Sequence, residues 1–305
     1  MFRNLTGVAV FLGVLLTMLS NAPGASPPET MTAVTYNIRY GSADDGENAW
    51  DKRSDLCIGV LKALDADIIG LQEALAFQVD EIRTEMPGYS LIGVGRDDGV
   101  RGGEYSPLLV RTDRFAIDQS GTVWLSDTPG VPGSMTWGNG LPRICTWARL
   151  IDLETGRALW VYNTHLDYRS LPSRKRSVEL IASLIAKRAN ADEPVVVMGD
   201  MNSGEGSVPV RYLRGEVASA SGRAATPPSP GLKDTFRAIH PDAEKVGTYS
   251  GFRDDSREGD KIDHILVSPF VTVLDAGIDR TRGPEGQYPS DHDAVWAIVA
   301  LNPKP

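Results

Sequence analysis

The amino-acid sequence predicts an α+β layered domain in which a few helices cover a largely antiparallel sheet. Runs with strand character outnumber runs with helical periodicity by roughly three to one. Several neighbouring strand-like runs are joined by turns too short to contain a helix, which favours antiparallel pairing. Composition is that of a globular protein, because 41% of the 305 residues are hydrophobic and 23% are charged.

The strand-like runs are short, apolar and rich in β-branched residues. The predicted strands are residues 31–38, 66–73, 89–95, 106–111, 114–125, 144–153, 158–166, 194–200, 261–268, 271–278 and 294–301. Apolar residues recur at helical spacing in residues 54–66, 74–86 and 172–190. Ser54 is the predicted N-cap of the first helix, since a serine hydroxyl can bond a free amide of the first turn.

Two segments rich in proline and glycine, residues 126–142 and 220–231, are predicted to be long loops. They are not predicted to be linkers, because strands of similar character continue on both sides. We therefore expect a single domain over residues 28–305.

The first 25 residues have the order of a secretory signal peptide. A single basic residue, Arg3, precedes an apolar stretch, residues 7–19, and small residues follow. This stretch is short for a membrane span, although an uncleaved N-terminal anchor is the alternative. We expect a secreted or periplasmic protein whose mature chain has no transmembrane segment.

The two cysteines, Cys57 and Cys145, lie in apolar settings, so two buried thiols and one disulfide are both compatible with the sequence. The formal net charge is −9. An acidic chain lacks the broad basic surface of a non-specific nucleic-acid binder, which makes nucleic acid a possible but disfavoured partner.

Polar side chains cluster at the ends of the predicted strands. In the stretch "GDMNS", Asp200 and Asn202 are two residues apart, which in an extended strand places them on one face. The other polar residues at such ends are Asn37, Glu73, Asn163, His165, Asp263, Asp291 and His292. Each is more often a turn or cap residue when taken alone, but their number calls for a common cause.

These residue types suit phosphoester chemistry. Glu73, Asp291 and the amide oxygen of Asn37 are hard oxygen donors of the kind that bind Mg²⁺, Mn²⁺ or Ca²⁺. His165 and His292 can bond a phosphoryl oxygen, and a carboxylate such as Asp263 can orient one imidazole. His264 follows Asp263 in a strand and is expected to face away from the site.

The ordered motifs "TYNIRY", "LQE", "NTHLD", "GDMNS", "IDHILVS" and "SDHDAV" resemble the endonuclease/exonuclease/phosphatase superfamily, which includes pancreatic deoxyribonuclease and nocturnin. The resemblance runs from about residue 32 to residue 299. Other stretches, such as "LPRICTWARL", are similar to an uncharacterised secreted bacterial branch nearer to nocturnin and the deadenylases. The implied fold is a four-layer α/β/β/α sandwich of two mixed sheets flanked by helices.

The resemblance also implies roles for individual residues. Metal-binding roles fall on Asn37, Glu73 and Asp291, and catalytic roles fall on His165, Asp200, Asn202, Asp263 and His292. Asp200 and Asn202 would position the attacking water, and His292, paired with Asp263, would contact the scissile phosphate or act as the base. His165 would steady a non-bridging oxygen or help the leaving group.

Three more residues are weaker candidates for substrate binding: Glu104, Arg143 and Arg174. Arg143 can grip a second anionic group bidentately, whereas Glu104 would repel one unless it met a metal, an amine or a sugar hydroxyl. A structural ion pair is the alternative for each.

We therefore expect a monomeric phosphodiesterase or phosphatase that depends on Mg²⁺ or Mn²⁺ and hydrolyses a phosphate-ester substrate by in-line attack of water. An extracellular nuclease, a sphingomyelinase-like enzyme and a non-catalytic binding module on the same fold are the alternatives.

Overall fold

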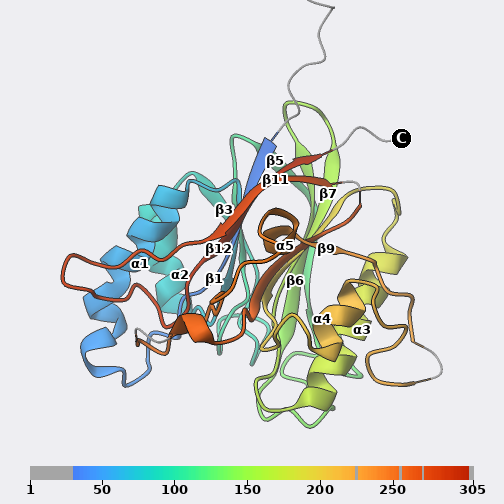
Figure 1. Ribbon diagram of the computed structural model, residues 1–305, viewed down its shortest axis with the longest axis horizontal. Coiled ribbons are helices and arrows are strands. Elements are labelled where there is room, and N and C mark those ends of the chain that lie inside the picture. Colours follow the sequence, from blue (N-terminus) through green and yellow to red (C-terminus); the bar gives the residue numbers. More distant parts are fainter. Residues whose placement is uncertain (1–29, 224–225, 254–255, 270, 302–305) are drawn as a thin grey trace, which may run out of the picture.

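Two six-stranded sheets pack face to face in the computed structural model, which describes residues 30–223, 226–253, 256–269 and 271–301 (Figure 1). The predicted signal peptide, residues 1–25, lies outside the described residues. Both sheets are mixed, because each contains one parallel pair among antiparallel neighbours. The predicted α+β class and the two-sheet sandwich are confirmed.

The first sheet has the strand order β11-β12-β1-β2-β4-β3. Its strands are β1 (Thr30–Asn37), β2 (Ile68–Gln72), β3 (Tyr89–Ile92), β4 (Leu108–Arg111), β11 (Val271–Ile278) and β12 (Val295–Leu301). The second sheet has the order β5-β6-β7-β8-β10-β9. Its strands are β5 (Phe115–Trp124), β6 (Ile144–Asp152), β7 (Ala158–His165), β8 (Val195–Asp200), β9 (Lys233–Asp234) and β10 (Asp263–Val267).

Helices cover the outer face of each sheet, as Figure 1 shows for α1 and α2 on one side and α3 and α4 on the other. The helices are α1 (Trp50–Leu64), α2 (Ala76–Glu85), α3 (Leu171–Lys187), α4 (Val208–Leu213) and α5 (Thr235–Ile239), with single 3₁₀ turns at Gly46–Asn48 and Ser256–Glu258. Three apolar clusters fill the spaces between the four layers. The middle cluster joins the two sheets, and the outer two bury the helices.

All eleven predicted strands are present, and the three predicted helices are α1, α2 and α3. The predicted cap at Ser54 is wrong, because α1 begins at Trp50 and places Ser54 inside the helix. The short elements β9, α4 and α5 were not predicted, since two to six residues are too few to show periodicity.

The two cysteines are buried free thiols. Cys57 lies in the cluster under α1 and α2, and Cys145 lies in the cluster under α3 and α4. They are on opposite sides of the sandwich, so they do not pair. No helix among the described residues is both long and apolar enough to cross a membrane.

A buried polar bridge joins the two sheets near their functional end. The amide nitrogen of Asn163, in β7, donates to the carbonyl oxygens of Leu71 and Pro107, each at 2.8 Å. Gln72 donates from Nε2 to the amide oxygen of Asn163 at 2.7 Å. Every bond crosses between the sheets, so this bridge fixes how far apart their strand ends lie. Asn163 is therefore a structural residue rather than part of the cleft.

Candidate active site

The two parallel pairs explain why the polar residues meet. In each sheet, parallel strands bring two carboxyl ends to the same edge: β1 with β2, and β7 with β8. His165 and Asp200 are register partners at one such edge. The antiparallel neighbour β10 begins there, with Asp263 opposite Asp200. Because β12 is antiparallel to β1, the segment before it delivers Asp291 and His292 to the same end.

At three strand ends, a residue with left-handed backbone conformation directs the chain into the site. Arg39, Glu73 and Asn202 have φ of 58°, 63° and 45°, and each follows a strand by one or two residues. Non-glycine residues seldom adopt this region, and strained positions gather at functional sites. Asn202 thus meets Asp200 through a turn, because the strand ends at Asp200. The predicted same-face alternation is wrong as the reason for their proximity.

These residues surround a cleft of about 610 Å³. It is lined by Arg39, Tyr40, Glu73, Arg96, Glu104, Leu141, Arg143, His165, Tyr168, Asp200, Asn202, Tyr249, Ile262, Asp291 and His292. Carboxylates, imidazoles and guanidinium groups therefore share one solvent-accessible space, which has the size of a small-ligand site.

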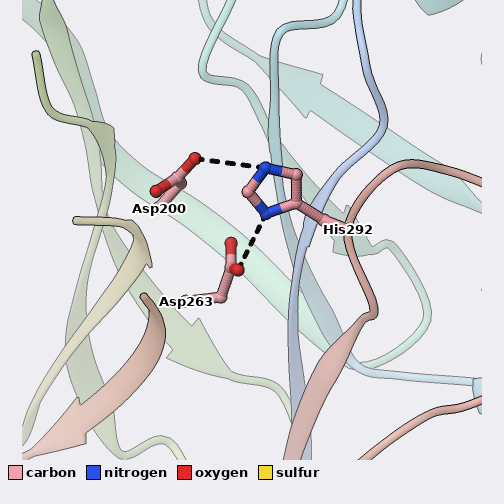
Figure 2. Close-up of side chains that lie close together, drawn as sticks. All are labelled: Asp200, Asp263 and His292. Carbon is pink, nitrogen blue, oxygen red and sulfur yellow. Dashed lines mark hydrogen bonds and ion pairs between the residues drawn. The ribbon is translucent and has the colours of Figure 1, made fainter. Parts of the chain in front are cut away.

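Asp200, Asp263 and His292 lie close together, and the first and last of them line the cleft (Figure 2). His292 Nδ1 lies 2.9 Å from Asp263 Oδ2, and His292 Nε2 lies 3.7 Å from Asp200 Oδ2. Asp263 is fully buried behind the imidazole. The ring is thereby fixed with Nε2 toward Asp200 and the cleft, which is the arrangement of a carboxylate that orients a catalytic histidine.

Asp200 is held by two hydrogen bonds and has an imidazole on either side. Its Oδ1 accepts a hydrogen bond from the amide of Asn202 at 2.8 Å, and its Oδ2 accepts one from Asn37 Nδ2 at 3.1 Å. His165 Nε2 is 3.4 Å from the same Oδ2, on the side opposite β10 in the strand order. Two imidazoles therefore flank one carboxylate.

The surroundings of Asp200, His292 and His165 shift the pKa of each side chain. Burial and the charge of Asp263 raise the pKa of Asp200 to about 7, although His292 opposes the shift. Burial alone would lower the pKa of His292, but Asp263 and then Asp200 outweigh it and raise that pKa well above its ordinary value. Burial, with Arg143 and Arg96, lowers the pKa of His165 well below its ordinary value. His292 is thus the charged imidazole of the site and His165 the neutral one.

Glu73, Asp291 and Asn37 lie together on the first-sheet side. Asn37 Nδ2 donates to Glu73 Oε1 at 3.1 Å, and the amide of Tyr40 donates to Glu73 Oε2 at 3.1 Å. The Asn37 amide oxygen, the predicted metal donor, accepts a hydrogen bond from the amide of Arg39 at 3.0 Å. Burial raises the pKa of Asp291, as does the nearby Glu73, while His292 lowers it. A divalent cation bound between these carboxylates would offset their mutual repulsion.

Two groups of side chains have the chemistry of cation ligands. Glu73 and Asp291 line the cleft as a pair of hard oxygen donors. Asp200, Asp263 and His292 offer three ligand atoms within 4.8 Å of one another, and Asp263 Oδ1 is buried without a hydrogen-bond partner. Because Asp263 already engages His292, the first pair fits a divalent cation that is also open to substrate.

The predicted site residues fall into three groups. Those that line the cleft are Glu73, Glu104, Arg143, His165, Asp200, Asn202, Asp291 and His292. Asn37 and Asp263 are buried beneath them and hold them. Arg174 is outside the lining and donates from Nη1 to the backbone oxygen of Asp167 at 2.7 Å. His264 faces away from the cleft, as expected, and is fully buried.

Sequence reasoning missed several lining residues. Arg39 and Tyr40 are the last two residues of the motif "TYNIRY", so their place within it was a usable signal. Arg96 forms a bidentate pair with Glu104 at 2.6 and 2.7 Å. Tyr249 packs its ring 5.0 Å from that of His292 and comes from an irregular loop, where no local pattern marks it.

The chain belongs to the Endonuclease/Exonuclease/phosphatase family, whose sequence profile matches residues 34–292. The match includes eleven of the twelve strands at least in part, all but β12, and every residue that lines the cleft. The predicted family and fold are confirmed, and members of this fold class hydrolyse phosphoesters.

Solved structures of related proteins agree. A family member from Bacteroides vulgatus is 32% identical, with a TM-score of 0.78 over 90% of this chain and 100% of that chain. A mannosyl-6-phosphatase from Bacteroides thetaiotaomicron is 30% identical, with a TM-score of 0.74 over 88% of this chain and 99% of that chain. The human nocturnin catalytic domain shares the fold at 19% identity, with a TM-score of 0.69 over 90% and 95%.

Among curated proteins, the uncharacterized protein L388 of Acanthamoeba polyphaga mimivirus is 27% identical over 161 residues. That match covers 50% of this chain and 59% of the viral protein.

Proposed function

We propose that this protein is a divalent-metal-dependent phosphoester hydrolase that uses water as its nucleophile. The observation that carries the proposal is Asp200, held between His165 at 3.4 Å and His292 at 3.7 Å, with Asp263 bound behind His292. This geometry offers a proton acceptor, a charged hydrogen-bond donor and a neutral imidazole around one point of the cleft. None of these groups is a hydroxyl or thiol nucleophile, which favours direct attack by water.

Glu73 and Asp291 would hold the cation, for which we propose Mg²⁺ or Mn²⁺. When bound, the cation would polarise a phosphoryl oxygen and offset the charge that develops there. Asn37, which bonds both Glu73 and Asp200, acts as a positioning residue that couples the ligand pair to the catalytic carboxylate.

Asp200 takes a proton from the attacking water while the water oxygen bonds to phosphorus and the ester oxygen leaves. The charged ring of His292 donates from Nε2 to a non-bridging oxygen, because Asp263 occupies its Nδ1. Asn202 lines the cleft beside Asp200 and helps to place the water. The products are an alcohol and a phosphate: Asp200 passes the proton that it took from the water to solvent, and the leaving oxygen takes a proton from solvent.

Sugar phosphates are the first natural substrates to test, because a mannosyl-6-phosphatase is 30% identical over 88% of this chain. The cleft volume of about 610 Å³ accommodates a compound of that size.

The test compares 4-nitrophenyl phosphate with methyl 4-nitrophenyl phosphate, with Mg²⁺, with Mn²⁺ and with excess chelator. We expect metal-dependent turnover that falls by about 100-fold or more in His165→Ala. His240→Ala is the matched control, since His240 lies far from the cleft and bonds the backbone oxygen of Ala276. Failure to hydrolyse either ester or a panel of sugar phosphates, with metal binding shown by calorimetry, would instead indicate a binding module.

A further inference from the structure

Arg143 is a buried guanidinium whose hydrogen-bonding capacity is largely unused. The residue is 3% exposed and lines the cleft. Its Nε and Nη1 atoms are buried and have no hydrogen-bond partner among the described residues. Arginine cannot lose its charge in a protein, and a buried donor without a partner costs free energy. The third nitrogen, Nη2, is not among these buried atoms, so an anion in the cleft would meet the guanidinium there.

Neighbouring carboxylates do not satisfy them. Asp167 Oδ2 is 3.6 Å from Arg143 Nε, which is ion-pair range but beyond a hydrogen bond. Asp167 Oδ1 is already bonded by the amides of Arg169 and Ser170, at 3.0 and 2.6 Å. Asp167 thus offsets part of the charge and leaves the donors free.

The other lining arginines differ from Arg143 in this respect. Arg96 lacks a partner only at Nε, because its Nη1 and Nη2 form the bidentate pair with Glu104, and Arg39 bonds Asp45 at 3.0 and 2.9 Å. Arg143 directly precedes β6, whose first residues pair with the last residues of β7, and it lines the cleft together with His165. An anion bound by Arg143 would therefore lie beside His165 and Asp200, where the phosphoryl group reacts.

We propose that Arg143 is the specificity-determining residue that makes this site prefer a phosphomonoester dianion to a phosphodiester. The inference rests on the proposed function. A monoester carries one more negative charge and one more free oxygen on phosphorus than a diester, whose additional substituent caps that oxygen. Guanidinium binds paired phosphate oxygens bidentately, so Arg143 gains most when two oxygens are uncapped.

The kinetic test uses 4-nitrophenyl phosphate and its methyl ester, which have the same leaving group and differ by one methyl cap. Wild type is expected to prefer the monoester. Arg143→Met is expected to lower kcat/KM for the monoester by about 100-fold and for the diester by less than about 10-fold. Arg143→Lys keeps the positive charge but loses the planar pair of donors, and its kcat/KM for the monoester is expected to lie between those of wild type and Arg143→Met.

A binding test separates this inference from the proposed function. Calorimetry of wild type and Arg143→Met with inorganic phosphate and with dimethyl phosphate needs no turnover. Phosphate affinity is expected to fall by at least about 10-fold in the variant, with dimethyl phosphate affected less. Circular dichroism checks that each variant is folded. Arg149→Met is the matched control, because Arg149 lies further along β6, is not among the residues that line the cleft, and pairs with Glu193 and Asp118.

Equal losses for both esters and both anions would overturn the proposal and leave Arg143 as a general phosphate contact. Unchanged phosphate binding in Arg143→Met would also overturn it. The proposal would also be wrong if Arg143 affected only the binding of compounds that carry a second anionic group remote from the ester. In that case the arginine would contact a different part of the substrate. If wild type is inactive but its phosphate binding still depends on Arg143, the proposed function is wrong, whereas the role of Arg143 in binding phosphate stands.

Discussion

Asp200 and Asp263 lie directly opposite each other in the antiparallel pair of β8 and β10, and both face His292. Only Asp263 bonds the imidazole, at 2.9 Å from Nδ1, whereas Asp200 is 3.7 Å from Nε2. One carboxylate therefore orients the ring and the other meets the cleft. Two aspartates on adjacent strands thus have different roles, because their surroundings differ.

Asp263→Asn is expected to lower kcat by about 100-fold or more while the fold is kept. The amide cannot stabilise a charged imidazole, so the pKa of His292 should fall toward or below its ordinary value. Nuclear magnetic resonance titration of His292 measures that direction independently of activity. Asp260→Asn, three residues earlier and exposed, is the control. An unchanged His292 titration would contradict the assignment.

Asp234→Asn is expected to destabilise the protein by about 3–5 kcal/mol at neutral pH, because it leaves Lys261 buried without its main partner. Lys261 Nζ is 2.9 Å from Asp234 Oδ2, and both side chains are buried. Burial would raise the pKa of Asp234, but Lys261 and His264 outweigh it and hold that pKa well below its ordinary value.

The sign of the pH dependence follows from that lowered pKa. The stabilisation by Asp234 is complete above the unfolded-state pKa of about 3.9 and is lost as the pH falls below it. The difference in the free energy of unfolding between wild type and Asp234→Asn, measured with urea, should therefore decrease by up to about 1.4 kcal/mol for each pH unit below about pH 4. A gap that stays constant through that range would contradict the ion pair.

Arg53→Lys is expected to cost about 2–3 kcal/mol of stability and to lower kcat. Arg53 Nη1 donates to the backbone oxygens of Ile38 and Pro289, at 2.9 and 2.8 Å, and so ties the exit of β1 to the segment before Asp291. A lysine has one nitrogen in place of three, so it cannot also replace the bonds from Nε to the backbone oxygen of Asn48 and from Nη2 to that of Arg39. Thermal unfolding and turnover of Arg83→Lys, an exposed position on α2, provide the baseline. Equal behaviour of the two variants would show that Arg53 does not hold the cleft.

Gly70→Ala and Gly59→Ala are expected to have opposite effects on stability. A methyl group at Gly70 would meet Asn163 Oδ1 and Met198 Sδ at 2.7 Å, and we expect a loss of about 1–3 kcal/mol. Gly59 is exposed within α1 and its methyl group would meet nothing within 4 Å, so alanine should add about 1 kcal/mol. Urea denaturation measures both; a neutral Gly70→Ala would mean that the bridge between the sheets can relax.

The amino-acid sequence by itself determined the strands, the three longer helices and the family, because these rest on local periodicity and on motifs in a fixed order. It also supplied eight of the residues that line the cleft, since most of them follow or precede a strand within a motif. Tyr249 and Arg96 were not predictable, because their loops have no repeating pattern.

Only the tertiary structure decided which polar groups are free to act. Glu104 is occupied by Arg96 and Arg174 by the backbone of Asp167, whereas Arg143 keeps unused donors. The amide of Asn37 turns its nitrogen, not its oxygen, toward Glu73 and Asp200. Hydrogen-bond partners come from segments distant in the chain, and burial sets the strength of each charge. Neither can be read from residues that are adjacent in sequence.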